Sequence, residues 1–203
     1  MKHFAIGLLG LTTIFVGATN AAPQTEVLFN GQDIKGWVVM HGGEWTVDDG
    51  VLVGRSGTNW STNPEKSGSW LRTAKEYKDF VLELEYSISP RGNSGVFFRS
   101  DTAKNPAFTG YEMQVTDDHG RQPGKGSTGA LYDVVAAAKN MSKPSGEWNH
   151  ARIEARGPLI RIWLNGEKIV EYEGSRRESG YIGLQNHDNR TTVKFRNIRV
   201  TPS

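Results

Sequence analysis

The most constraining feature of this sequence is the strict alternation of apolar and polar side chains in short segments. "FVLELEYSI" (residues 80–88) and "GYEMQV" (residues 110–115) both follow this pattern. Because successive side chains of a strand point to opposite faces, a period of two predicts a half-buried strand. The apolar side chains predicted to be buried are Phe80, Leu82, Leu84, Tyr86, Ile88, Tyr111, Met113 and Val115.

The turns between such segments are typical of antiparallel sheets. In "LIRIWLNGEKIVEY", Asn165-Gly166 separates two alternating runs and predicts a hairpin with a type I′ turn. Similar runs recur between Gly-, Asn- and Asp-rich turns, and no segment has convincing helical periodicity. Many short strands of this kind predict an all-β fold, either a sandwich or a barrel.

The N-terminus has the layout of a secretory signal peptide. A basic Lys2 precedes an apolar run over residues 4–16, and small residues surround Ala21. Cleavage after Ala21 is preferred, since a cut after Ala22 would leave Pro23 at the scissile bond. An uncleaved anchor is the alternative, but the run is short for a bilayer span. We therefore expect residues 1–21 to be removed, and residues 22–203 to form a periplasmic or secreted domain with no further membrane association.

Composition narrows the class of protein further. The chain of 203 residues contains no Cys, so an exported form must be held by its core rather than by disulfides. The mature length fits one domain. With 24 basic and 22 acidic residues, the formal net charge is only +2, and no nucleic-acid partner is predicted.

Ten phrases, in their order along the chain, resemble the 3-keto-disaccharide hydrolase family, formerly a domain of unknown function. They are "LFNGQDIKGW", "EWTVDDGVLVG", "DFVLELEY", "GNSGVFFR", "GYEMQV", "TGALYD", "KPSGEWN", "RIWLNGEKI", "YIGLQNH" and "VKFRNIRV". The resemblance covers essentially the whole mature chain. It implies a concanavalin A-like jelly roll of two packed antiparallel sheets, one convex and one concave. It also implies a periplasmic or secreted protein that acts on sugars.

The segment "GYEMQVTDD" holds the first candidate for chemistry. Glu112, Gln114 and Asp117 resemble the E-x-D-x-x-E motif of laminarinase-type glycosidases, but the middle carboxylate is an amide here and the last is a shorter Asp. On a regular strand, Asp117 would lie opposite Glu112 unless a bulge intervened. A conventional glycosidase needs two carboxyl groups about 5–9.5 Å apart. These residues therefore match that pattern poorly.

A 3-keto sugar requires different catalytic groups. The ketone acidifies the C2–H bond, so one base can form an enolate, and the C1 aglycone then leaves before water adds. Glu112 is the predicted base, with Asp117 beside it as a further candidate catalytic residue; a solvated or ion-paired strand carboxylate is the alternative. Arg99 is predicted to bind the keto oxygen, or else to form an ordinary ion pair. His187 is predicted to protonate the leaving oxygen, or else to be an exposed loop residue.

Four residues are predicted to bind the sugar. Gln114 and Gln185 would hydrogen-bond hydroxyl groups, unless they are solvated surface amides. Trp163 and Arg161 share a face opposite the apolar positions of "LIRIWL", so an indole platform for a sugar ring is predicted there. No metal site and no cofactor are predicted, because the acidic and His pairs lack a closed zinc spacing and are more often solvated turn residues. The alternative is a metal ion that replaces Arg99 as the group stabilising the enolate.

The sequence leaves three functions open. The first is an exported enzyme that cleaves 3-keto-glycosides by elimination followed by hydration. The second is a non-catalytic carbohydrate-binding module, which would use the aromatic and amide side chains but not a base. The third is an adhesion or scaffold domain whose polar sheet face is ordinary surface.

Overall fold

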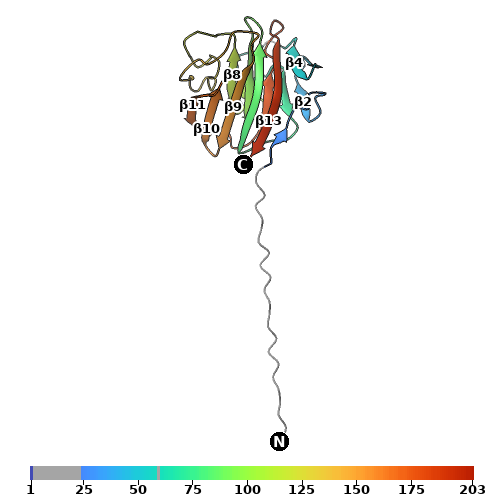
Figure 1. The fold of residues 1–203 in the computed structure, drawn as a ribbon, viewed down its shortest axis with the longest axis vertical. Coiled ribbons are helices and arrows are strands. Elements are labelled where there is room, and N and C mark those ends of the chain that lie inside the picture. Colours follow the sequence, from blue (N-terminus) through green and yellow to red (C-terminus); the bar gives the residue numbers. More distant parts are fainter. Residues whose placement is uncertain (2–23, 59) are drawn as a thin grey trace.

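Two antiparallel sheets pack face to face in the computed structural model (Figure 1). The structure describes Met1, residues 24–58 and residues 60–203. The predicted signal peptide and its cleavage site therefore lie outside the described residues, apart from Met1. The predicted all-β sandwich is confirmed.

The larger sheet has eight strands, and the smaller has five. The order in the larger sheet is β11 (Glu167–Glu173), β10 (Leu159–Leu164), β9 (Asn149–Arg156), β6 (Phe80–Ile88), β13 (Val193–Pro202), β4 (Val51–Arg55) and β3 (Glu44–Asp48), with β1 (Glu26–Val27) also paired to β13. The order in the smaller sheet is β2 (Trp37–Met40), β5 (Trp70–Thr73), β12 (Tyr181–Gln185), β7 (Asn93–Ser100) and β8 (Tyr111–Thr116). A single turn of helix, α1 (Pro106–Thr109), connects β7 to β8.

The inner faces of the two sheets form the hydrophobic core. All eight apolar side chains predicted from the alternation of β6 and β8 are buried. Their neighbours on β6, Glu83 and Glu85, lie on the outer face of the larger sheet, where they pair with basic side chains. The predicted hairpin joins β10 to β11, with positive φ angles of 51° at Asn165 and 88° at Gly166. Alternation and turn chemistry therefore predict this part of the fold correctly.

The helix α1 was not predicted by the sequence pattern. Its N-cap is Asn105, whose side chain accepts a hydrogen bond from the backbone N–H of Ala107, and Pro106 occupies the first turn. Four residues are too few to show helical periodicity. In the sequence, only Asn105 as a possible N-cap and Pro106 after it indicate that a helix begins here. Within residues 24–58 and 60–203, no helix is long or apolar enough to cross a membrane.

The smaller sheet is covered on its outer face as well as its inner face. Residues 129–132 run along the free edge of β8, where Tyr132 N donates to Glu112 O at 2.8 Å and Gly129 N donates to Gln114 O at 2.8 Å. The helix α1 packs against both β7 and β8. As a result, the polar side chains of Glu112 and Gln114 are buried although they point away from the core.

Candidate functional site

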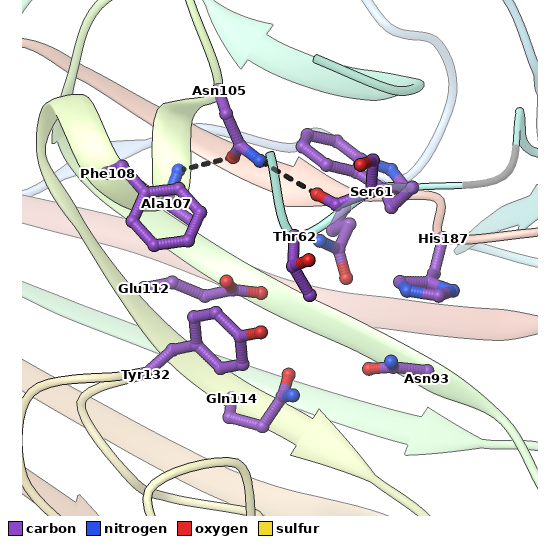
Figure 2. Close-up of a pocket in the computed structure, with 12 residues that line it drawn as sticks. Ser61, Thr62, Asn93, Asn105, Ala107, Phe108, Glu112, Gln114, Tyr132 and His187 are labelled. Carbon is purple, nitrogen blue, oxygen red and sulfur yellow. Dashed lines mark hydrogen bonds between the residues drawn. The ribbon is translucent and has the colours of Figure 1, made fainter. Parts of the chain in front are cut away.

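A pocket opens on the outer face of the smaller sheet (Figure 2). It contains about 400 Å³ of free space, including its open mouth. Its lining is mostly polar, with three aromatic side chains, Trp60, Phe108 and Tyr132. The lining residues are Trp60, Ser61, Thr62, Asn93, Asn105, Ala107, Phe108, Glu112, Gln114, Tyr132, Gln185 and His187.

Three adjacent strands and four connections supply these residues. Neighbouring strands β8, β7 and β12 carry Glu112, Asn93 and Gln185 respectively, because outward positions of paired strands share one face. The connection between β4 and β5 supplies the wall that begins at Trp60. Asn105 ties that wall to α1, since its Nδ2 donates to Ser61 O at 3.2 Å (Figure 2).

Trp60, which lines the pocket, packs against a buried cluster of aromatic side chains. Trp70 and Phe97 pack edge to face with centroids 5.5 Å apart, and Trp60 lies against Phe97 at 5.4 Å. This packing requires a glycine on β12, because a Cβ at Gly183 would overlap the Trp70 ring. Because Trp70 and Phe97 are fully buried, Trp60 is the ring of these three that offers a surface to a sugar in the pocket.

Glu112 is the most unusual group in the pocket. Its side chain is buried with only 3% of the residue exposed, and its Oε1 has no hydrogen-bond partner among the described residues. Burial raises the pKa of this carboxyl group well above its ordinary value. The carboxylate lies across β7 at Gly95, where any Cβ would overlap its Oε1. Because Gly95 has no side chain, it leaves space for the Glu112 carboxylate.

Two further buried acceptors face the same pocket. Asn93 Oδ1 and Gln185 Oε1 are buried without a partner among the described residues. An unpaired buried acceptor costs about 1–3 kcal/mol, so a ligand that offers several hydroxyl donors would recover that free energy. Gln114 lines the pocket as well, but its Oε1 accepts from the backbone N–H of Val115 at 3.1 Å.

His187 faces Glu112 from the opposite side of the pocket (Figure 2). Its Nδ1 is 3.0 Å from Asp188 Oδ2, and Asp188 Oδ1 accepts from the backbone N–H groups of Arg190 and Thr191 at 2.8 Å. Burial opposes ionisation of Asp188, but the hydrogen bonds from His187 and the two backbone N–H groups outweigh it and lower the pKa of the carboxyl group. The ionised carboxylate thus orients the imidazole ring.

Tyr132 stands beside Glu112, with its hydroxyl group directed into the pocket (Figure 2). Its ring packs edge to face on Phe108 at a centroid distance of 6.1 Å. Burial, together with the nearby charges of Glu112 and Asp133, raises the pKa of the phenol. The hydroxyl group therefore stays protonated and available as a hydrogen-bond donor.

The structure brings together four of the residues predicted to act in the site: Glu112, His187, Gln114 and Gln185. Their individual roles stay predictions. Sequence reasoning missed Tyr132, Asn93, Trp60 and Asn105, which come from connections or from the first residue of a strand. The phrases "TGALYD" and "GNSGVFFR" contain Tyr132 and Asn93, so the family resemblance was the available signal.

Arg99 does not lie in this pocket, and its predicted place there is wrong. One extra residue in β7 opposite β12 forms a bulge, and Arg99 within it has a φ of 50°. The bulge directs the side chain to the end of the sandwich. There it donates to Lys78 O, Gly157 O and Asp79 Oδ1 at 2.6–2.8 Å, tying the two sheets together.

Asp117 is also outside the pocket. Its Oδ2 accepts from the backbone N–H of Arg91 at 2.7 Å, and its own N–H donates to Gly92 O at 3.1 Å. The carboxylate thereby stabilises the turn before β7 instead of pairing with Glu112. No carboxylate pair of the conventional glycosidase kind lines the pocket in the described part of the chain.

The placement predicted for Trp163 and Arg161 is wrong as well. Both point away from the core, as the alternation predicted, but β10 belongs to the larger sheet, so they lie on the opposite side of the sandwich from the pocket. Arg152 packs over the Trp163 ring at 5.3 Å, and Arg161 Nε pairs with Glu171 at 2.8 Å. These contacts stabilise the outer surface of the larger sheet.

No group of three or more His, Cys, Asp or Glu side chains among the described residues is arranged to hold a metal ion. The titratable groups that line the pocket are Glu112, Tyr132 and His187.

Burial of Glu112 predicts a distinctive dependence of stability on pH. Because its folded-state pKa lies above the ordinary value of 4.5, the folded protein keeps a proton that the unfolded chain releases. The resulting stabilisation is complete below about pH 4.5 and is lost as the pH rises through the folded-state pKa. In that window the free energy of unfolding of wild type should fall, relative to Glu112→Gln, by up to about 1.4 kcal/mol per pH unit. Urea unfolding of both proteins at pH 5 and pH 8 measures this, and an unchanged difference would contradict the burial.

Comparisons with known proteins identify relatives that act on carbohydrates. Residues 24–201 match the family model described as a 3-keto-alpha-glucoside-1,2-lyase-like domain. A curated relative from Bacteroides thetaiotaomicron, named 3-keto-disaccharide hydrolase, is 27% identical over 224 positions, covering 85% of this chain and 76% of that protein.

Solved structures show the same architecture. A candidate glycosyl hydrolase from Parabacteroides distasonis superimposes with a TM-score of 0.74 at 27% identity, covering 88% of this chain and 94% of the other. The carbohydrate-binding module CBM66 from Bacillus subtilis has a TM-score of 0.58 at 23% identity, covering 81% and 94% of the two chains, and shows the shared fold alone.

Proposed function

Because the chain belongs to the family of 3-keto-alpha-glucoside-1,2-lyase-like domains, we propose that it cleaves the glycosidic bond of 3-keto-glycosides. One observation carries the proposal: a buried carboxyl group, with one oxygen that has no partner among the described residues, faces a carboxylate-bound imidazole across a polar pocket. The name of the Bacteroides relative supports the substrate class. Two unlike proton-transfer groups suit an elimination better than a conventional displacement, which needs a carboxylate pair.

The first step is removal of the C2 proton by Glu112. The electron pair of the C2–H bond forms a C2=C3 double bond, and the carbonyl π electrons move to the C3 oxygen to give an enolate. Collapse of the enolate restores the C3 ketone, forms a C1=C2 double bond and expels the aglycone oxygen from C1. His187 donates the proton that this oxygen takes up.

Hydration completes the reaction. Water adds to C1 of the unsaturated ketone, His187 takes up the proton that this water loses, and the proton held by Glu112 returns to C2. The net change is hydrolysis of the glycosidic bond, with the base and the acid restored.

The environment of Glu112 fits the requirements of such a base. Burial makes its carboxylate more basic than an exposed one. Sugar hydroxyl groups that donate to the carboxylate favour its ionised form, so binding of the sugar promotes the active state. The amides of Asn93, Gln114 and Gln185 supply neutral partners for the remaining hydroxyl groups.

We also propose that the protein is exported, with its signal peptide cleaved after Ala21. The basic, apolar and small-residue regions of residues 1–21 support this. N-terminal sequencing of the protein recovered from the periplasm or medium should begin at Ala22. An N-terminus at Met1 would contradict the proposal.

The activity test compares an oxidised glycoside with its parent. Purified protein is incubated with 4-nitrophenyl 3-keto-α-glucoside and with unoxidised 4-nitrophenyl α-glucoside, and release of nitrophenol is followed. We expect release from the 3-keto substrate only, because only the ketone acidifies C2–H. Binding of both compounds without release would instead identify a carbohydrate-binding module.

A further inference from the structure

The proposed elimination needs a hydrogen-bond donor for the enolate oxygen, and Arg99 is not available for it. Its guanidinium group is buried at the end of the sandwich and bonded to Lys78 O, Gly157 O and Asp79. No Lys or Arg among the described residues lines the pocket. The negative charge that develops on the C3 oxygen must therefore be stabilised by another group.

Tyr132 lies where such a donor is required. C2 and C3 are adjacent atoms of the sugar ring, so a donor to the C3 oxygen must stand next to the base that attacks C2–H. Figure 2 shows the Tyr132 hydroxyl group beside the Glu112 carboxylate, and both point into the same space. The backbone bond from Tyr132 N to Glu112 O at 2.8 Å links the two residues across the edge of β8.

His187 occupies the complementary position. C1 and C3 are the two ring neighbours of C2. The group that protonates the C1 oxygen and the group that donates to the C3 oxygen should therefore lie on different sides of C2, from which Glu112 removes the proton. Tyr132 and His187 stand on opposite sides of the pocket (Figure 2). With Tyr132 beside Glu112 and His187 across the pocket, the phenol is placed for the C3 oxygen and the imidazole for the C1 oxygen.

The Tyr132 hydroxyl group is also free to bind a ligand. No described residue forms a hydrogen bond with it, while packing on Phe108 holds the ring. A preorganised donor aimed at a developing oxyanion lowers the barrier more than a mobile one, because it does not have to reorient during the reaction.

We propose that Tyr132 is a catalytic residue that stabilises the enolate by donating a hydrogen bond to the C3 oxygen of the 3-keto sugar. The inference rests on the proposed function. It assigns to a neutral phenol the role that the sequence alone assigned to a guanidinium group. The proton stays on the phenol oxygen, so no additional proton transfer is needed.

The test is Tyr132→Phe, which removes the hydroxyl group and keeps the ring on Phe108. We expect turnover of 4-nitrophenyl 3-keto-α-glucoside to fall about 10²–10³-fold. Exchange of the C2 proton with deuterated water, followed by NMR, should fall by a similar factor because the enolate is the shared intermediate. The melting temperature should stay unchanged.

Tyr181→Phe is the matched control. Tyr181 lies at the start of β12, where it packs under Arg72 at 4.2 Å, and it is outside the pocket. This variant should exchange and cleave at the wild-type rate. An active wild type with an equally active Tyr132→Phe variant overturns the inference alone. A wild-type protein that neither exchanges C2–H nor cleaves the substrate overturns the proposed function, and this inference with it.

Discussion

Glu112→Gln is expected to lower turnover of 3-keto-glycosides about 10²–10⁴-fold, the contribution typical of a positioned base. The amide keeps the shape of the side chain and fits the space over Gly95, but it cannot accept the C2 proton. Exchange of the C2 proton with deuterated water should be lost together with turnover. Initial rates and NMR exchange on the same substrate measure both effects.

Glu171→Gln is the control for that substitution. Glu171 lies on the outer surface of the larger sheet, where it pairs with Arg161 and Lys168. The same chemical change there should leave turnover unaltered. The elimination mechanism fails if Glu112→Gln retains full activity, or if wild type cleaves the substrate in deuterated water without label at C2.

His187→Gln should distinguish the role of the acid, which protonates the leaving oxygen, from that of the base, which removes the C2 proton. With a methyl aglycone, which is a poor leaving group, cleavage should fall about 10²–10⁴-fold because the C1 oxygen is no longer protonated as it leaves. With a 4-nitrophenyl aglycone, which leaves as a stable anion, the loss should be small. Exchange of the C2 proton should persist, since Glu112 is intact.

The two aglycones distinguish this role from a structural one. A variant that has lost the shape of the pocket would be slowed equally on both substrates and in C2 exchange. Equal loss on the methyl and nitrophenyl substrates would therefore contradict the assignment of His187 as the acid. His150→Gln is the control, because His150 lies on β9 in the larger sheet, away from the pocket.

The site shows how far alternation of side chains can predict function. Glu112 and Gln114 are correctly predicted to share a face, because that depends only on the period of a regular strand. Trp163 and Arg161 are correctly predicted to face away from the core, but they lie on the wrong side of the molecule. Alternation reports which residues of one strand share a face, and it contains no information on which sheet the strand joins.

Arg99 and Tyr132 show two further limits. A one-residue bulge reverses the direction of the side chain at Arg99, and nothing in "GVFFRS" marks that bulge. Tyr132 enters the pocket because residues 129–132 pair with the edge of β8 through backbone hydrogen bonds. Residues 129–132 do not show the alternation that marks a strand. Such bonds form between groups that every residue carries, so side-chain identity does not predict them.

The sequence by itself determined the strands, the Asn165-Gly166 turn, the apolar core of β6 and β8, and the family. The strands, the turn and the core depend on local chemistry: the period of the strand, the positive φ that Asn and Gly accept, and the free energy gained by burying apolar side chains. The family followed from phrases matched in order along the chain. Only the tertiary structure decided that Glu112 is buried, with no partner for its Oε1 in the described part of the chain, and that His187 and Tyr132 stand on either side of the pocket. Those properties arise from the register of β7, β8 and β12 and from the connections folded over them, which bring together residues distant in the chain.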